Sequence, residues 1–251
     1  MSPQVAIIAL GAIAAGFVQG LSGFAFGLVA MSFWAWTVDP RLAAALVVFG
    51  SLTGQLIAAF SVRRGFDLKR LLPFLIGGLA GIPIGVAILP LLDVRLFKAV
   101  LGLLLVIWCP VMLFARHLPR VTAGGAGADG AVGLIGGVLG GIGGFTGAVP
   151  ILWCTLRRMD KDTQRGIIQN FNLATLAATM TAYVVTGTVT TEMLPLFAIV
   201  APAMLIPTLL GARLYHRVSE ATFRRIVLSL LAASGMALLV SALPFSQLGS
   251  G

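Results

Sequence analysis

Every one of the 17 lysines and arginines in this 251-residue chain lies at the end of an apolar run, and none lies in the middle of one. The chain is 59% apolar and 10% charged, whereas a soluble domain is typically about 25% charged. A soluble fold of this size cannot bury so much apolar surface, so lipid must solvate much of it. The sequence therefore predicts an all-α integral membrane protein. The net charge of +9 indicates basic residues beside lipid headgroups rather than a nucleic-acid partner.

The apolar runs divide the chain into two halves. The run over 3–38 is too long for one span of about 20 residues, and a hydrophilic, Gly-rich segment over 116–130 separates the halves. We expect a first repeat over 1–115 (hairpin 3–38, spans 42–62, 71–92 and 96–115), a linker over 116–130, and a second repeat over 131–245 (hairpin 131–156, spans 167–185, 193–214 and 223–243).

Glycines in the long first run of each half align at a constant offset of 120 residues. The aligned pairs are Gly16 with Gly136, Gly20 with Gly140, Gly23 with Gly143, and Gly27 with Gly147. Both halves also share the order of a Gly-rich run, a span, a span containing Ile-Pro, and a final span. This shared order favours an internal duplication.

The basic residues give the chain an orientation. If each Gly-rich run folds back as a broken-helix hairpin, the clusters at 63–70, 116–120, 157–165 and 213–225 lie on one side of the membrane. They hold four, two, four and four basic residues, and only Arg41, Arg95 and Lys98 lie opposite. If the runs cross as simple spans, eleven basic residues lie on one side of the membrane and six on the other, which is a weaker bias. The positive-inside rule therefore favours hairpins, which place both termini outside and invert the second half. Inverted repeats are typical of alternating-access transporters.

The hairpin tips are candidate anion sites. The first N–H groups of a helix that restarts inside the membrane lack intrahelical partners and carry partial positive charge. Two such starts bind an anion without a buried Lys or Arg. The candidate residues at the tips are Gln19, Ser22, Gly23, Gly143, Gly144 and Thr146. The alternative interpretation is that the glycines serve close helix packing.

Three amides early in the span over 167–185 form a second cluster. Amides in a membrane span face a cavity or a partner, because burying them in lipid is costly. We expect Asn170 and Asn172 to contribute to the substrate site, with Gln169, Ser51 and Gln55 on its wall. The alternative is that these side chains only hydrogen-bond helices together.

Several absences narrow the function. The sequence has no carboxylate in the middle of a span, no GxxxxGK[ST], no HExxH and no GxSxG. We therefore expect no enzyme activity, no cofactor and no metal site.

The Gly-rich runs resemble those of the sulfite exporter TauE/SafE family, also called the four-toluene sulfonate uptake permease family. The resemblance covers nearly the whole chain. It rests on Gly16-x3-Gly20-x2-Gly23-x3-Gly27, on the run from Gly140 to Gly147 with Pro150 after it, and on Ile206-Pro207-x3-Gly211-Ala212-Arg213. Family members usually carry a GxGGG-type run in both halves, whereas the first half here reads LSGFAFG. The resemblance implies a transporter of sulfite, sulfoacetate or related organosulfonates.

We therefore expect a secondary transporter of small sulfur-containing anions, working by alternating access in the bacterial cytoplasmic (inner) membrane. Its expected partners are the small anionic substrate and membrane lipid, with no nucleic acid. A passive anion channel and a non-transporting membrane assembly partner are the alternatives. The exact anion, the direction of transport, the coupling ion and a homo-oligomeric state stay open.

Overall fold

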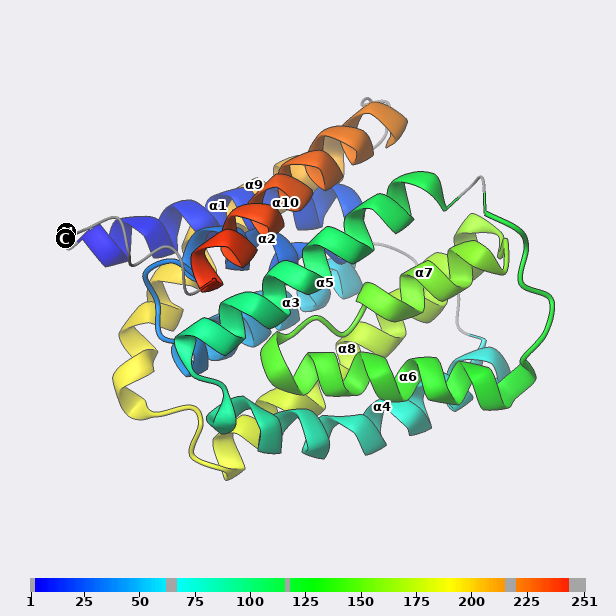
Figure 1. Cartoon of the computed structure of the whole chain (residues 1–251), viewed down its shortest axis with the longest axis horizontal. Helices are drawn as coiled ribbons and strands as arrows, with labels where there is room; N and C mark the ends of the chain where they lie inside the picture. The colour runs from blue at the N-terminus through cyan, green and yellow to red at the C-terminus, as the bar shows by residue number, and fades with distance from the viewer. Residues whose placement is uncertain (1–2, 62–66, 116–117, 215–219, 244–251) are drawn as a thin grey trace.

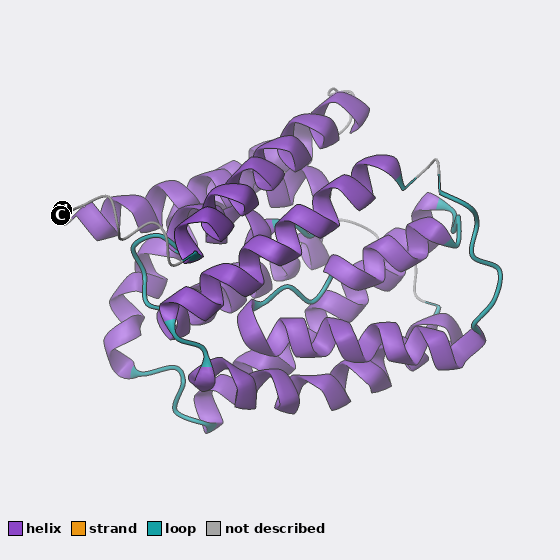
Figure 2. Cartoon of the chain, viewed as in Figure 1, coloured by secondary structure: helices purple, strands orange, loops and turns teal. Residues whose placement is uncertain are grey.

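The computed structural model describes residues 3–61, 67–115, 118–214 and 220–243, and these residues form helices and loops without a strand (Figure 2). The helices are α1 (Pro3–Ser22), α2 (Phe26–Trp34), α3 (Pro40–Ser61), α4 (Leu68–Ile88), α5 (Val94–Phe114), α6 (Gly125–Gly143), α7 (Ala148–Leu156), α8 (Lys161–Val185), α9 (Leu194–Leu214) and α10 (Glu220–Ala242), with 3-10 turns η1 (Leu89–Leu91) and η2 (Thr191–Met193). In the described part of the chain, seven helices are long and apolar enough to cross a membrane. The predicted all-α membrane fold is confirmed.

The first Gly-rich run folds back on itself. Helix α1 ends at Gly23, whose φ of 83° is left-handed, a conformation that favours glycine. Helix α2 then returns along α1, because the indole Nε1 of Trp34 at its end donates to the carbonyl O of Ile8 at 3.2 Å. Gly11 makes room for that indole.

The second run folds in the same way. Helix α6 begins at Gly125, inside the segment expected as a linker, and ends at Gly144 with φ 75°. Helix α7 returns along it, and Nε1 of Trp153 donates to Oδ1 of Asp129 at 2.7 Å. In Figure 1, α1 begins at the left end of the molecule and α6 begins at the right end. The two hairpins therefore enter from opposite ends.

Each hairpin packs on the other half of the chain. Helix α1 pairs with α9, α6 pairs with α4, and α5 pairs with α10 (Figure 1). Glycines bring the backbones together: a Cβ at Gly16 would lie 2.8 Å from the carbonyl O of Met204 on α9, and one at Gly141 would lie 2.6 Å from that of Ile82 on α4. Small residues at membrane helix interfaces allow such close approach.

The left-handed glycines that follow α1 and α6, Gly23 and Gly144, are 121 residues apart, one more than the offset of 120 expected from the sequence. At the offset of 121, Gly16 matches Gly137 and Gly20 matches Gly141, and all four face a backbone carbonyl of a helix in the other half. At the expected offset, the partners Gly136 and Gly140 instead face Thr146. Three of the four glycines of the first run still align with glycine at the offset of 121, and the helix contacts distinguish the two registers.

Helices α3 and α8 lie at the centre, against each other and against the hairpins. The first half of α3 is buried from Ala43 to Val48, without a lipid-facing side. Helix α8 is not among the seven candidate spans, since its sequence includes charges in its first turns and several amides and hydroxyls further along. It contacts α3 and α4.

Basic side chains gather at the ends of the helices. At one end, Arg41 donates to the carbonyl O of Pro90 at 3.4 Å, Arg95 donates to that of Ala242 at 2.7 Å, and Lys98 lies 5.3 Å from the centre of the Trp36 ring. Arg70, Arg120, Arg157 and Arg158 lie together around one cavity at the other end. Arg63, Arg64, Arg116 and Arg217 lie outside the described residues.

Candidate functional site

The tips of the two hairpins contact each other beside α3. A Cβ at Gly27, in the first turn of α2, would lie 2.9 Å from Cγ1 of Val47 and 3.4 Å from the carbonyl O of Gly144. A Cβ at Gly144 would in turn lie 2.7 Å from Cγ1 of Val47. The first turn of α2 and the last turn of α6 are thus held side by side by small residues.

Five residues expected at the site, four of them buried and one half-buried, form one polar group, called here the amide cluster. It consists of Gln19, Gly23, Ser51, Gln55 and Gln169. Nε2 of Gln19 donates to the carbonyl O of Ser51 at 3.2 Å, and Nε2 of Gln55 donates to that of Gly23 at 2.8 Å. A Cβ at Gly23 would lie 3.5 Å from Nε2 of Gln169. The cluster joins α1, α3 and α8 at the tip of the first hairpin.

The amide cluster has unused hydrogen-bonding capacity. Within the described residues, Oε1 of Gln19, Oγ of Ser51 and Oε1 of Gln169 are buried and have no hydrogen-bond partner. All three side chains are at most 4% exposed. Buried polar atoms are nearly always paired, and each exception calls for an explanation such as an absent ligand or water. Three such atoms in one cluster favour a place for a polar ligand.

Thr146 and Asn172 form a second polar contact at the tip of the other hairpin. Oγ1 of Thr146 donates to Oδ1 of Asn172 at 2.8 Å, and both residues are 2% exposed. Gly147 leaves room for the Asn172 amide. Asn172 is three residues after Gln169, so the two amides lie on one side of α8. Asn170 is half-buried and has a polar partner of its own.

Two residues of the expected site lie elsewhere. Ser22 is exposed, and its Oγ accepts from the N–H groups of Phe24 and Ala25 at 3.4 and 3.3 Å. Gly143 is buried, and the ring of Phe145 covers the position of its missing side chain. The structure therefore does not bring these two residues to the amide cluster.

The helix starts differ in how they are capped. Helices α3, α4, α5 and α8 begin at the ends of the molecule, where the carboxylates of Asp39, Asp67, Asp93 and Asp160 accept backbone N–H groups. The inner helices α2 and α7 follow Ala25 and Gly147, and no side chain caps either start. An anion could therefore take the place that a carboxylate takes elsewhere.

Sequence reasoning missed one buried carboxylate. Asp129 was expected in a linker, yet it lies in the second turn of α6 and is 8% exposed. It accepts from Nη1 of Arg157 at 2.8 Å as well as from Trp153. The Gly-rich flanks hid the start of the helix, because glycine is a poor helix former. Among the described residues, no group of three His, Cys, Asp or Glu side chains could hold a metal ion.

The comparison with known proteins identifies one family. The family model "Sulfite exporter TauE/SafE" matches residues 8–238, which includes both hairpins and nearly all of the helical core. No curated protein and no solved structure matches the chain. The chain is a multi-pass membrane protein that belongs to the sulfite exporter TauE/SafE family of transporters.

Proposed function

We propose that this protein is a secondary transporter of small sulfur-containing anions, with sulfite, sulfoacetate and related organosulfonates as the substrate class. The observation that supports this most is the pairing of two uncapped inner helix starts with the amide cluster. The helix starts offer N–H donors and partial positive charge without a buried cation, and the amide cluster adds the unpaired hydroxyl of Ser51. The binding residues would be Gln19, Gly23, Ser51, Gln55, Gln169, Thr146 and Asn172, with Gly144 shaping the tip.

An inverted repeat accounts for the helix contacts. A pseudo-two-fold axis that exchanges the halves maps the α1–α9 pair onto the α6–α4 pair and maps the α5–α10 and α3–α8 contacts onto themselves. Hairpins that enter from opposite ends follow from the same symmetry (Figure 1). In the orientation we propose, the end with Arg70 and Arg157 faces the bacterial cytoplasm and both termini lie outside.

Alternating access would move units that combine the two halves. The glycine contacts fix α1 to α9 and α6 to α4 at backbone distance, so neither pair can slide easily. Around the central helices and the hairpin tips the glycines instead face side chains, such as that of Val47 against Gly27 and Gly144, and side chains can rotate as helices move. We therefore propose that the α1–α2–α9 unit rocks against the α4–α6–α7 unit across α3 and α8, and the anion binds at the tips between them.

The direct test is counterflow of radiolabelled sulfite in proteoliposomes. Gln169→Met removes a buried amide with an unpaired Oε1, so the fold should tolerate it, while flux should fall about tenfold or more if the amide binds the anion. Thr181→Val on the same helix is the matched control, because Thr181 is exposed and its hydroxyl bonds only the carbonyl O of Ala177. If Gln169→Met transports sulfite at the wild-type rate, the amide cluster does not bind the substrate.

The same preparation separates the alternative functions. A carrier shows saturable uptake and counterflow, whereas an anion channel shows a current that rises linearly with voltage. A non-transporting assembly partner shows neither. Sulfite counterflow that is absent under every gradient would overturn the proposed function.

A further inference from the structure

An arginine-lined cavity lies at the end of the molecule where α4 begins and α7 ends, away from the hairpin tips. Its volume is about 440 Å³, and its charged lining residues are Arg70, Arg120, Arg157, Arg158, Asp129 and Asp160. They come from three segments: the start of α4, the connector between the halves, and the α6–α7–α8 region. A ligand in this cavity would touch both halves of the chain.

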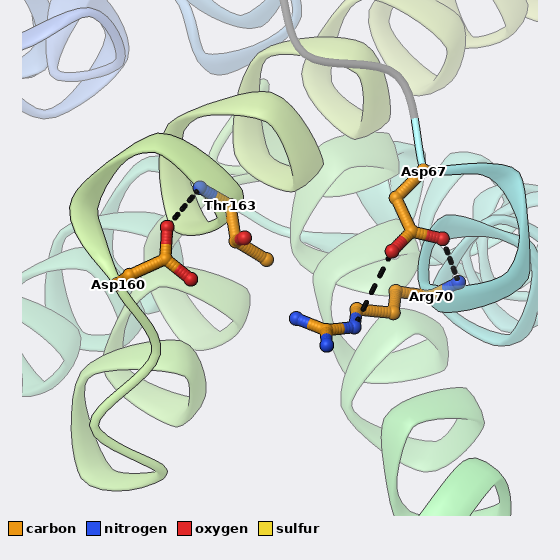
Figure 3. Close-up of polar contacts among 4 residues, drawn as sticks. All are labelled: Asp67, Arg70, Asp160 and Thr163. Atoms are coloured by element: carbon orange, nitrogen blue, oxygen red, sulfur yellow. Dashed lines mark hydrogen bonds and ion pairs between the residues drawn. The ribbon is translucent and has the colours of Figure 1, made fainter.

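The two carboxylates of the lining are already engaged. Asp129 accepts from Arg157 and Trp153, and Oδ1 of Asp160 accepts from the backbone N–H of Thr163 at 2.9 Å. Figure 3 shows the side chain of Arg70 extending from α4 into the space between Asp67 and Asp160, with Asp67 bonded to its Nε. Four guanidinium groups thus stand against three carboxylates, counting Asp67, and the cavity carries an excess of positive charge.

Two of the arginines are unpaired. The guanidinium groups of Arg120 and Arg158 form neither a hydrogen bond nor an ion pair with any other described residue, and both residues are exposed. They are free to bind a ligand from solution. A guanidinium presents a planar fork of N–H donors that fits the oxygen atoms of sulfate, sulfite or phosphate.

The backbone of Arg158 supports a functional role for this side chain. Its φ of 52° is left-handed, and it is the one described non-glycine residue with a positive φ. It ends α7 in a turn closed by the N–H of Met159 on the carbonyl O of Cys154 at 3.1 Å. Glycine is the usual residue at that position, because a side chain there is strained. An arginine held in this conformation points to a requirement for its charge.

We propose that this cavity is a second binding site, for a small oxyanion, and that Arg120 and Arg158 bind it. The anion could be free in solution, as sulfate or sulfite, or it could be the phosphate of an anionic lipid headgroup. The site does not depend on transport, since the cavity is separate from the amide cluster. Binding of the anion beside Arg157 would also disturb the contact of Asp129 with Trp153.

Trp153 provides the readout. The protein is placed in nanodiscs of zwitterionic lipid at low ionic strength, and its tryptophan fluorescence is followed during titration with sodium sulfate, with sodium chloride matched in ionic strength as the reference. We expect a saturable change that is absent in Trp153→Phe. Arg158→Gln should weaken the apparent affinity about tenfold. Arg225→Gln, which removes the same charge from the exposed early part of α10, should leave the affinity unchanged.

A second titration identifies the source of the anion. Nanodiscs with increasing phosphatidylglycerol and no sulfate replace the free anion by a headgroup. A Trp153 response to sulfate assigns the site to free oxyanions, and a response to phosphatidylglycerol alone that Arg158→Gln abolishes assigns it to lipid. No response in either arm, or equal weakening by Arg158→Gln and Arg225→Gln, would overturn the proposal. Asn172→Leu should leave both responses intact, so failure of the central transport site is read separately from failure here.

Discussion

The close packing of α6 against α4 can be tested with a single methyl group at Gly141. A Cβ there would lie 2.6 Å from the carbonyl O of Ile82 and 2.7 Å from the backbone N of Val86, whereas ordinary contact begins at 3.4 Å. In Gly141→Ala, α6 and α4 must therefore separate locally by about 0.8 Å. Backbone atoms cannot rotate away as a flexible side chain can, so the helices themselves must shift.

The expected loss of stability follows from three contributions. Overpacking costs about 1–3 kcal/mol. The carbonyl O of Gly141 also accepts from the hydroxyl of Tyr183 at 2.7 Å, and loss of that hydrogen bond costs about 1 kcal/mol. Alanine returns about 0.5–1 kcal/mol through its better helix propensity. We expect a net destabilisation of about 1–3 kcal/mol.

The measurement is the melting temperature of the purified protein in detergent. A change of 1 kcal/mol shifts the melting temperature by about 2–4 °C in a chain of this size, so Gly141→Ala should melt several degrees below wild type. Gly127→Ala on the same helix is the control, because its Cβ would have nothing within 4 Å. If Gly141→Ala melts at or above Gly127→Ala, the α4–α6 contact is not close-packed and the proposed rigid unit has no basis.

Three further predictions address the second tip, one helix cap and the orientation. Thr146→Val leaves Oδ1 of buried Asn172 without its donor, so we expect sulfite flux to fall and stability to drop by about 1–3 kcal/mol, while Thr146→Ser keeps both; equal behaviour of the two variants would contradict the role of the hydroxyl. The pKa of Asp160 lies below its ordinary value because the backbone N–H and then the hydroxyl of Thr163 hydrogen-bond its carboxylate. The cap should therefore stabilise α8 above about pH 4 and lose its effect as the pH falls through the lowered pKa. Melting temperatures of Asp160→Ala and wild type should then differ at pH 7 and converge in acid. Cysteines in place of Arg41 and Arg120 should react with impermeant thiol reagents from opposite sides of the membrane, and labelling from one side would refute the proposed orientation.

The candidate site was only partly accessible from the sequence. The two Gly-rich runs and the amides of α8 indicated which segments matter, and Gln19, Gly23, Ser51, Gln55 and Gln169 do come together. Ser22 does not join them, because a short Ser turn directs its hydroxyl to the backbone of its own loop. The burial of Asp129 was also missed, since its partners Trp153 and Arg157 are distant in sequence and meet it only after α7 folds back.

By itself, the sequence determined that this is an all-helical membrane protein and in which two Gly-rich runs the chain reverses. Those properties depend on one coordinate, the depth of each residue in the membrane, and charge and apolar length report depth directly. The tertiary structure alone decided that α1 packs on α9 and α6 on α4, in a register one residue away from the apparent repeat. Lipid satisfies an apolar helix face as well as another helix does, so hydrophobicity selects no partner. The packing partner of a helix is decided instead by the glycines, because two backbones approach closely only where glycines of distant segments meet.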